Sequence, residues 1–299
     1  MQKLTIGLLG AATLLLTTAM PAQADLRDAG AAGAAPAAVS DEERAPGRVI
    51  NKWLAQDRIN FRAMGEELAR IGVTDVRISN PAFGIENASP RQADLTYTKY
   101  VRAQVGVTSD DQNVIFDVPV NAFTITTVAY NFVYTGGNSD NIEAHWNFRD
   151  DYVNGSAPDD AVGIALESYN FGCYSTINTW KESYTWNNSH QTSDDAIWLE
   201  SLTPTAAVWR IRDRVSGFQL NVDHGFTAIS LRRYNAEENP PSCGSDRSQR
   251  IDASSYFEHN QDGNGSWSAS IGWGLFQLNY TGSAGDRLQK AGGIASIRF

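Results

Sequence analysis

The sequence has 299 residues, of which 42% are hydrophobic, and its 34 acidic residues outnumber its 24 lysines and arginines, for a net charge of −10. A chain of this charge repels nucleic-acid phosphates and anionic membrane surfaces, so we expect neither as a partner. Its length suits one large domain rather than two.

The first 24 residues have the pattern of a secretory signal peptide. A basic start is followed by the apolar run 4–20 and by an A-x-A cleavage site at 22–24. This run is short for a membrane span, and no later segment reaches about 18 uninterrupted apolar residues, so we expect no transmembrane helix. We therefore predict a secreted or periplasmic protein.

Two segments follow before the pattern changes. Residues 25–48 are rich in Ala, Gly and Pro, which predicts a flexible linker or propeptide. Ser40 to Glu43 resembles a helix capping box, but Pro46 limits any helix there. Residues 49–72 carry apolar side chains at helical spacing and end at a glycine, which predicts an amphipathic helical segment, either one helix or two short ones.

From residue 73 to 299 the apolar residues alternate with a period of two, which indicates an all-β domain. Short alternating segments separated by turn clusters predict an antiparallel β-sandwich or a jelly-roll-like single domain. In 141–148 the alternation leaves Glu143, His145 and Asn147 opposite an apolar face, and 135–141 is the predicted hairpin loop before it. The predicted strands are 97–107, 113–120, 124–134, 141–148, 161–169, 196–202, 206–213, 217–223, 226–234, 266–280 and 293–299.

A small outer-membrane β-barrel is the alternative fold, and it would place the protein in the outer membrane. Residues 266–280 read as one strand with an apolar face, and the ending Arg298-Phe299 resembles that of such barrels. A barrel needs strands of about 9–11 residues with a continuous apolar band. Asp213 interrupts that band in the segment around 206–213, so we favour the sandwich.

The two cysteines predict a disulfide. Cys173 and Cys243 are the only cysteines of a chain that we expect to enter an oxidising compartment. By the chain-entropy model, closing a loop of about 70 residues contributes roughly 4 kcal/mol.

The segment 259–267 contains a partial calcium motif. Asn260, Asp262 and Asn264 match the first half of a calcium loop, but Ile271 stands where the bidentate glutamate belongs. A Gly/Asn-rich hairpin loop is the expected structure and calcium the alternative, with no other cofactor predicted. The four histidines lack the sequence spacing of metal ligands. They are His145, His190, His224 and His259.

Glu143, Glu167 and His145 are the candidate catalytic residues. Each lies among apolar strand residues, and glycosidases use two carboxylates, one with a raised pKa. With so many acids some pair is always available, so an outward-facing position on a solvated sheet is the alternative. We expect a binding protein rather than an enzyme, and a secreted polysaccharide hydrolase or lyase is the competing hypothesis.

Aromatic side chains suggest what the protein binds. Trp180, Tyr184 and Trp186 share one strand parity among Asn, Ser, Thr and Glu residues. Flat rings beside hydroxyl and amide groups suit sugars, whereas the alternative is that these rings fill the sandwich core. The sequence thus predicts a secreted β-sandwich protein whose partner is an extracellular glycan or a surface protein.

Overall fold

The computed structural model describes residues 38–56, 58–90, 96–98, 123–148, 159–167, 173–185, 190–191, 196–216, 219–233, 250–261, 265–272, 275–282 and 286–298. For the strand residues within 96–98, 190–191, 215–220 and 260–291, and for Arg298, the backbone alone is described. The predicted signal peptide and the predicted strands 101–107 and 113–120 lie outside the described residues. No helix in the described ranges combines the length and hydropathy that a membrane span requires.

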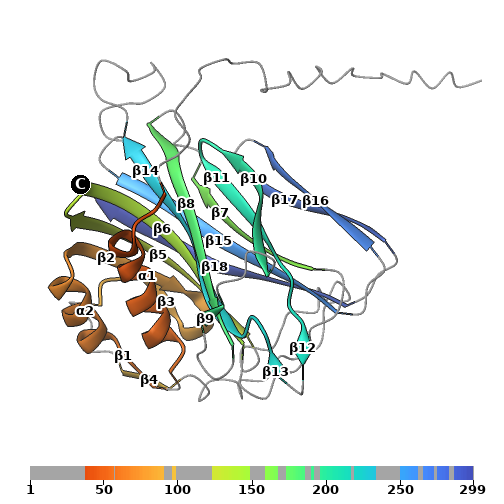
Figure 1. The fold of residues 1–299 in the computed structure, drawn as a ribbon, viewed down its shortest axis with the longest axis horizontal. Coiled ribbons are helices and arrows are strands. Elements are labelled where there is room, and N and C mark those ends of the chain that lie inside the picture. Colours follow the sequence, from red (N-terminus) through yellow and green to blue (C-terminus); the bar gives the residue numbers. More distant parts are fainter. Residues whose placement is uncertain are drawn as a thin grey trace, which may run out of the picture. The chain divides into compact units, whose positions relative to one another are not determined.

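One layer is a seven-stranded antiparallel sheet in the order β3-β2-β5-β6-β14-β8-β9 (Figure 1). Tyr134 pairs with Gly137, so the β5–β6 turn is shorter than the predicted loop 135–141, and Gly137 adopts a φ of 133° that favours glycine. The strands are β2 (Val73–Asn80), β3 (Ile85–Ala88), β5 (Phe123–Tyr134), β6 (Gly137–Phe148), β8 (Tyr174–Tyr184), β9 (His190–Gln191) and β14 (His224–Arg233).

The other layer is a five-stranded antiparallel sheet in the order β10-β11-β7-β15-β18. Strand β15 lies between β7 and β18, so a strand from late in the chain completes a sheet begun much earlier. The strands are β7 (Asp160–Leu166), β10 (Ile197–Thr203), β11 (Ala206–Ile211), β15 (Arg250–Gln261) and β18 (Asp286–Arg298).

The two sheets pack face to face around one apolar core. Trp146 on β6, Trp209 on β11 and Phe257 on β15 belong to it, and all three are buried. The Thr127 hydroxyl lies 2.6 Å from the Ser255 hydroxyl and donates to the Gly293 carbonyl at 2.8 Å, which joins β5 to β15 and β18. Among the described strands none pairs with a strand of the opposite layer, so the fold is the predicted sandwich and not a closed barrel.

Three further pairs of strands lie outside the two layers. The predicted strand 266–280 is wrong as a single strand, because it is a hairpin in which Gly272 pairs with Leu275. Alternation alone could not reveal the reversal, since both strands keep the period of two. The pairs are β1 (Arg58–Asn60) with β4 (Thr96–Thr98), β12 (Val215–Ser216) with β13 (Gln219–Leu220), and β16 (Gly265–Gly272) with β17 (Leu275–Gly282).

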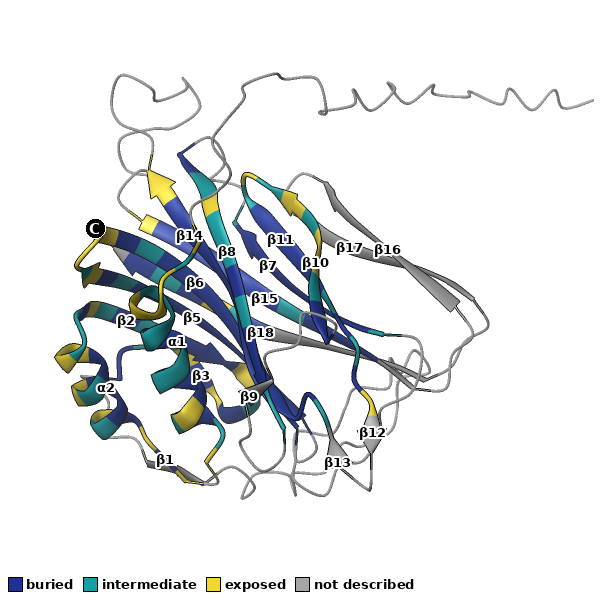
Figure 2. Ribbon diagram, in the orientation of Figure 1, coloured by how far each residue is buried: buried dark blue, intermediate teal, exposed yellow. Residues whose placement is uncertain are grey.

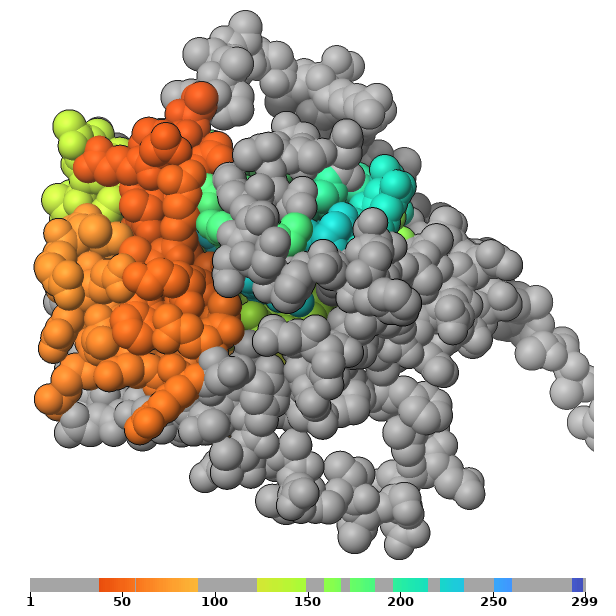
Figure 3. Space-filling view, turned by 60° about the horizontal axis from the view of Figure 1, so that its bottom comes forward, coloured from red at the N-terminus to blue at the C-terminus, as the bar shows by residue number. Residues whose placement is uncertain are grey.

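Two helices, α1 (Asp41–Leu54) and α2 (Phe61–Arg70), pack on the outer face of the seven-stranded sheet (Figure 2). Figure 3 shows both helices, coloured red to orange, lying against each other. Their apolar faces and those of β2, β3 and β5 bury a second core. A 3-10 turn, η2 (Pro81–Phe83), follows β2.

Helix α1 begins earlier than predicted. Ser40 and Glu43 form the full capping box, and the helix runs through Pro46, so residues 41–48 of the predicted linker are helical. Pro46 lies in the second turn and lacks the backbone N–H that would bond to the Glu42 carbonyl, whereas the capping box satisfies N–H groups at the start of the helix. The predicted helical segment 49–72 is thus two helices separated by β1.

Candidate functional site

The outer face of β6, β14 and β8 carries a set of polar and aromatic side chains that we call the outer-face grid. Alternation on β6 places Glu143, His145 and Asn147 opposite the core, as predicted. Strand register then aligns them in three rows across the sheet. The rows are Glu143–Ala228–Trp180, His145–Phe226–Glu182 and Asn147–His224–Tyr184.

The grid brings together residues that the sequence presents separately. Two predicted catalytic candidates, Glu143 and His145, share one face with two predicted ligand-binding residues, Trp180 and Tyr184. The sequence alone does not reveal this shared face, because the face forms only when β14 pairs with both β6 and β8.

Glu143 is the hub of a buried hydrogen-bonded group. The Tyr130 hydroxyl donates to Glu143 Oε1 at 2.7 Å, and His145 Nε2 lies 2.7 Å from Glu143 Oε2. The His145 ring also stacks on Phe226, with ring centroids 5.1 Å apart. Burial, followed by the charge of Glu143, raises the pKa of Tyr130 well above its usual value, so the phenol stays a donor.

Helix α1 covers this group. Glu143 is 0% and His145 2% exposed, so both face away from the core, as in the outward-facing alternative considered from the sequence, but neither is solvated. At Gly47 the helix lies so close to the sheet that a Cβ atom would be 2.7 Å from Glu143 Oε1 and 2.6 Å from Phe226 Cζ. Only glycine therefore lets the helix backbone reach the sheet here.

The margin of the grid is built around Glu182. Arg48 Nε of α1 donates to both Glu182 oxygens at 2.9 Å, and the Tyr184 hydroxyl donates to Oε2 at 2.9 Å. The hydrogen bond to Glu182 raises the pKa of Arg48, and burial followed by the Glu182 charge raises the pKa of Tyr184. The Tyr184 ring is stacked on the His224 ring, whose Nδ1 lies 3.0 Å from Asp223 Oδ2.

Trp180 does not lie on the surface. It is 5% exposed and packs against Phe226, Ala228 and Val39, as in the core alternative considered from the sequence, although in a cluster outside the main core. Its indole Nε1 has no hydrogen-bond partner in the described part of the chain. Tyr184 is half-buried, and Trp186 lies outside the described residues.

The remaining predicted site residues are not brought into the grid. Glu167 follows β7 in the other sheet, where it accepts from the Ser254 hydroxyl at 3.4 Å, so it does not pair with Glu143. Asn260 belongs to β15 with only its backbone described, and Asp262 and Asn264 lie outside the described residues, so the calcium alternative stays untested.

Of the two cysteines in the predicted disulfide, the structure describes only Cys173. Cys173 is fully buried and is not a free thiol, whereas Cys243 lies outside the described residues, so the Cys173–Cys243 pairing stays a prediction.

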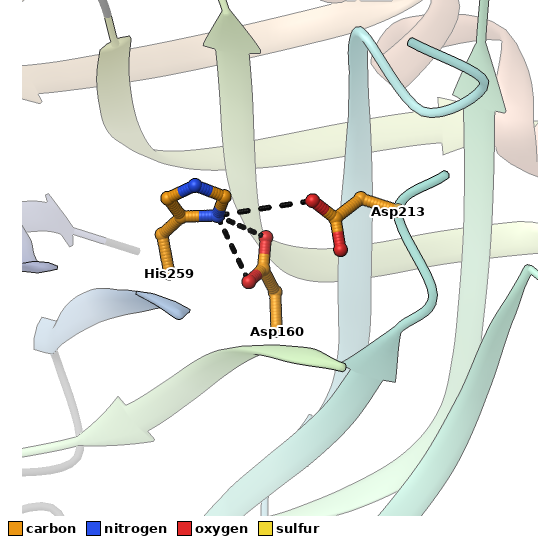
Figure 4. Close-up of side chains that lie close together, drawn as sticks. All are labelled: Asp160, Asp213 and His259. Carbon is orange, nitrogen blue, oxygen red and sulfur yellow. Dashed lines mark hydrogen bonds and ion pairs between the residues drawn. The ribbon is translucent and has the colours of Figure 1, made fainter. Parts of the chain in front are cut away.

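A second polar cluster lies inside the sandwich, at one end of the five-stranded sheet (Figure 4). His259 Nδ1 lies 2.9 Å and 2.8 Å from the two Asp160 oxygens and 3.9 Å from Asp213 Oδ2. The three side chains are 0% exposed. Burial, followed by the Asp160 charge, raises the pKa of Asp213 to about 10.

Sequence reasoning missed this second cluster, although a signal exists. On β7, Asp160 has the same parity as the core residue Val162, and on β15 His259 has the parity of Phe257. Asp213 follows Ile211 in the same way at the end of β11. A core-facing row that ends in an ionisable residue on three strands is unusual, because such residues are rarely fully buried without partners.

Comparisons with known proteins give likenesses to solved structures alone. No family model and no curated protein matches the sequence. Among solved structures, the chain is similar to a "Pore forming protein" (6% identity, TM-score 0.33, 59% of this chain and 90% of that chain). It is also similar to Clostridium perfringens delta-toxin (8%, 0.33, 58% and 88%) and to the NetB toxin of Clostridium perfringens in its membrane-inserted form (8%, 0.31, 59% and 91%).

Proposed function

We propose that the protein is exported and binds a hydroxyl-rich extracellular or cell-surface ligand, such as a glycan, at the margin of the outer-face grid. The observation that carries this proposal is that the Tyr184 hydroxyl donates a hydrogen bond to the ion pair formed by Glu182 and Arg48. An aromatic ring and a positioned ion pair therefore lie side by side. The Arg48 side chain is 37% exposed and Tyr184 is half-buried, so both can be reached from solvent.

The chemistry of this margin suits neighbouring hydroxyl groups. The Glu182 side chain is only 1% exposed, so its carboxylate would hold Arg48 and Tyr184 in place rather than contact the ligand. The partly exposed Arg48 guanidinium donates several hydrogen bonds in a fixed fork, which suits ligand hydroxyls. One face of the Tyr184 ring is stacked on His224, and on this proposal sugar C–H groups would pack against the exposed part of the ring. Because Arg48 holds Glu182 through two hydrogen bonds, the ligand need not order these side chains on binding.

The polysaccharide hydrolase or lyase hypothesis would use the Glu143–His145 pair instead. That pair lies beneath Gly47, so a substrate would reach it only after α1 had moved. The two hypotheses are separated by incubating the protein with polysaccharides. Turnover that Glu143→Gln abolishes would favour the enzyme, whereas we expect no turnover.

The binding proposal is tested with a glycan array followed by calorimetry on the best oligosaccharide. We expect Tyr184→Ala to weaken binding about tenfold or more, because it removes both the ring and a hydrogen bond to Glu182. Tyr134→Ala is the matched control, since the Tyr134 hydroxyl also donates to a glutamate, Glu43 of α1, at 3.1 Å. Equal binding by the two variants, or no glycan captured by the folded protein, would overturn the proposal.

A further inference from the structure

We infer that Asp160, Asp213 and His259 bind a divalent transition-metal ion, of which Zn²⁺ is the best match. The site lies away from the proposed glycan margin, on the core side of the other sheet. Its three residues come from β7, from the segment after β11 and from β15, which are adjacent in that sheet.

The geometry suits one ion. The candidate ligand atoms all lie within 4.8 Å of one another, and His259 Nδ1 is 2.8 to 3.9 Å from the nearest carboxylate oxygens. Two ligands bound to Zn²⁺ at about 2.1 Å in tetrahedral geometry are about 3.4 Å apart. Movements of the side chains alone could therefore bring the three atoms around an ion.

Asp213 supplies an independent indication of a ligand. Neither of its carboxylate oxygens has a hydrogen-bond partner in the described residues, although the side chain is fully buried. Leaving such a group unsatisfied costs free energy, and buried charges are normally paired or bound to metals. Figure 4 shows the Asp213 carboxylate directed toward His259 and Asp160.

Charge balance favours a divalent ion. Two ionised carboxylates and a neutral imidazole match the two positive charges of the metal. Arg212 is next to Asp213 in sequence, but its guanidinium pairs with Asp159, with Nε 3.4 Å from Asp159 Oδ1. The Phe148 ring borders the site, 5.5 Å from the His259 ring, so an ion there would be bound in a largely apolar end of the core.

The donor types select the class of metal. An imidazole with two carboxylates suits Zn²⁺ or a neighbouring transition metal, whereas Ca²⁺ and Mg²⁺ require six or more oxygen ligands. Three protein ligands leave a fourth position of a tetrahedral ion open.

The test uses the full chain purified without a histidine tag and freed of metal with EDTA. Titration with ZnCl₂ in a calorimeter should show one ion per chain and a raised melting temperature, whereas CaCl₂ and MgCl₂ should show neither. Asp213→Asn, which is neutral and of similar size, should weaken Zn²⁺ binding about 100-fold or more. Asp252→Asn, another buried carboxylate on β15, is the control and should bind Zn²⁺ like the wild type.

Co²⁺ absorption on the wild-type protein gives a readout that does not depend on any variant folding. A d–d spectrum of a four-coordinate ion is expected, and it should disappear in Asp213→Asn when far-ultraviolet circular dichroism shows that the variant is folded. The inference is overturned if the folded wild type binds neither Zn²⁺ nor Co²⁺, or if folded Asp213→Asn binds them equally well.

Discussion

Replacing Gly47 by alanine would set two opposing effects against each other. Alanine in place of glycine in a helix interior stabilises by about 1 kcal/mol. At this position, however, the new Cβ would lie 2.6 Å from Phe226 Cζ, closer still to Phe226 Cε2, and 2.7 Å from Glu143 Oε1. Phe226 cannot move aside easily, because it is fully buried and stacked on His145.

The steric effect should win. Adding a methyl group to a well-packed interior costs about 1–3 kcal/mol, and both neighbours of this one are held in place. Because three atoms would lie within 3 Å of the new Cβ, we take the upper part of this range, about 2–3 kcal/mol. Subtracting the helix gain of about 1 kcal/mol, we expect Gly47→Ala to lower the free energy of unfolding by about 1–2 kcal/mol.

Urea denaturation followed by tryptophan fluorescence measures this change. Phe226→Leu, alone and combined with Gly47→Ala, completes a double-mutant cycle, in which Gly47→Ala should cost less when residue 226 is leucine than when it is phenylalanine. A Gly47→Ala protein that is more stable than the wild type by about 1 kcal/mol, as helix propensity alone predicts, would refute the close approach of α1.

Three further changes test other parts of the structure. Ser40→Ala should lower the free energy of unfolding by about 1 kcal/mol through loss of the capping box, measured by urea denaturation, and an unchanged midpoint would contradict a formed cap. Arg48→Met should lower the free energy of unfolding by about 2 kcal/mol in the same assay, because it leaves the buried Glu182 carboxylate without Arg48 as its ion-pair partner. The loss should be smaller than for a fully buried ion pair, since Arg48 is partly exposed. In the metal-free protein, the pKa of Asp213 rises from 3.8 to about 10 on folding, so its contribution to stability is fully present below pH 4 and is lost as pH rises toward 10. The wild type should therefore lose stability relative to Asp213→Asn across this range, whereas parallel urea midpoints would show that Asp213 titrates normally.

The period-two alternation was enough to predict the sandwich and the two faces of β6. It separated Trp146 and its core neighbours from Glu143 and His145 correctly. Alternation failed where a turn preserves it, as between β16 and β17. The start of α1 was predicted too late for a separate reason, because the helix continues through Pro46. Both failures concern local boundaries rather than the pattern itself.

The candidate sites were harder to predict, because both depend on which strands are neighbours. Nothing in the sequence around Glu143 indicates that α1 covers it, so its burial could not be predicted from alternation. Asp160 and His259 are 99 residues apart, and only the position of β15 beside β7 joins them. The position of a residue in the alternation shows which face of the sheet it occupies, but the pairing of distant strands decides which residues contact it on that face.

The place of β15 in its sheet also has a consequence for folding. All strands of the seven-stranded sheet end by Arg233, and its β5–β6 hairpin pairs residues close in sequence. The five-stranded sheet cannot be completed until β15 and β18 arrive from beyond residue 249 and close a long loop, which is a slow step. His259 is therefore among the last residues to be positioned, so metal uptake at Asp160 and Asp213 would serve as a signal that the whole chain has folded.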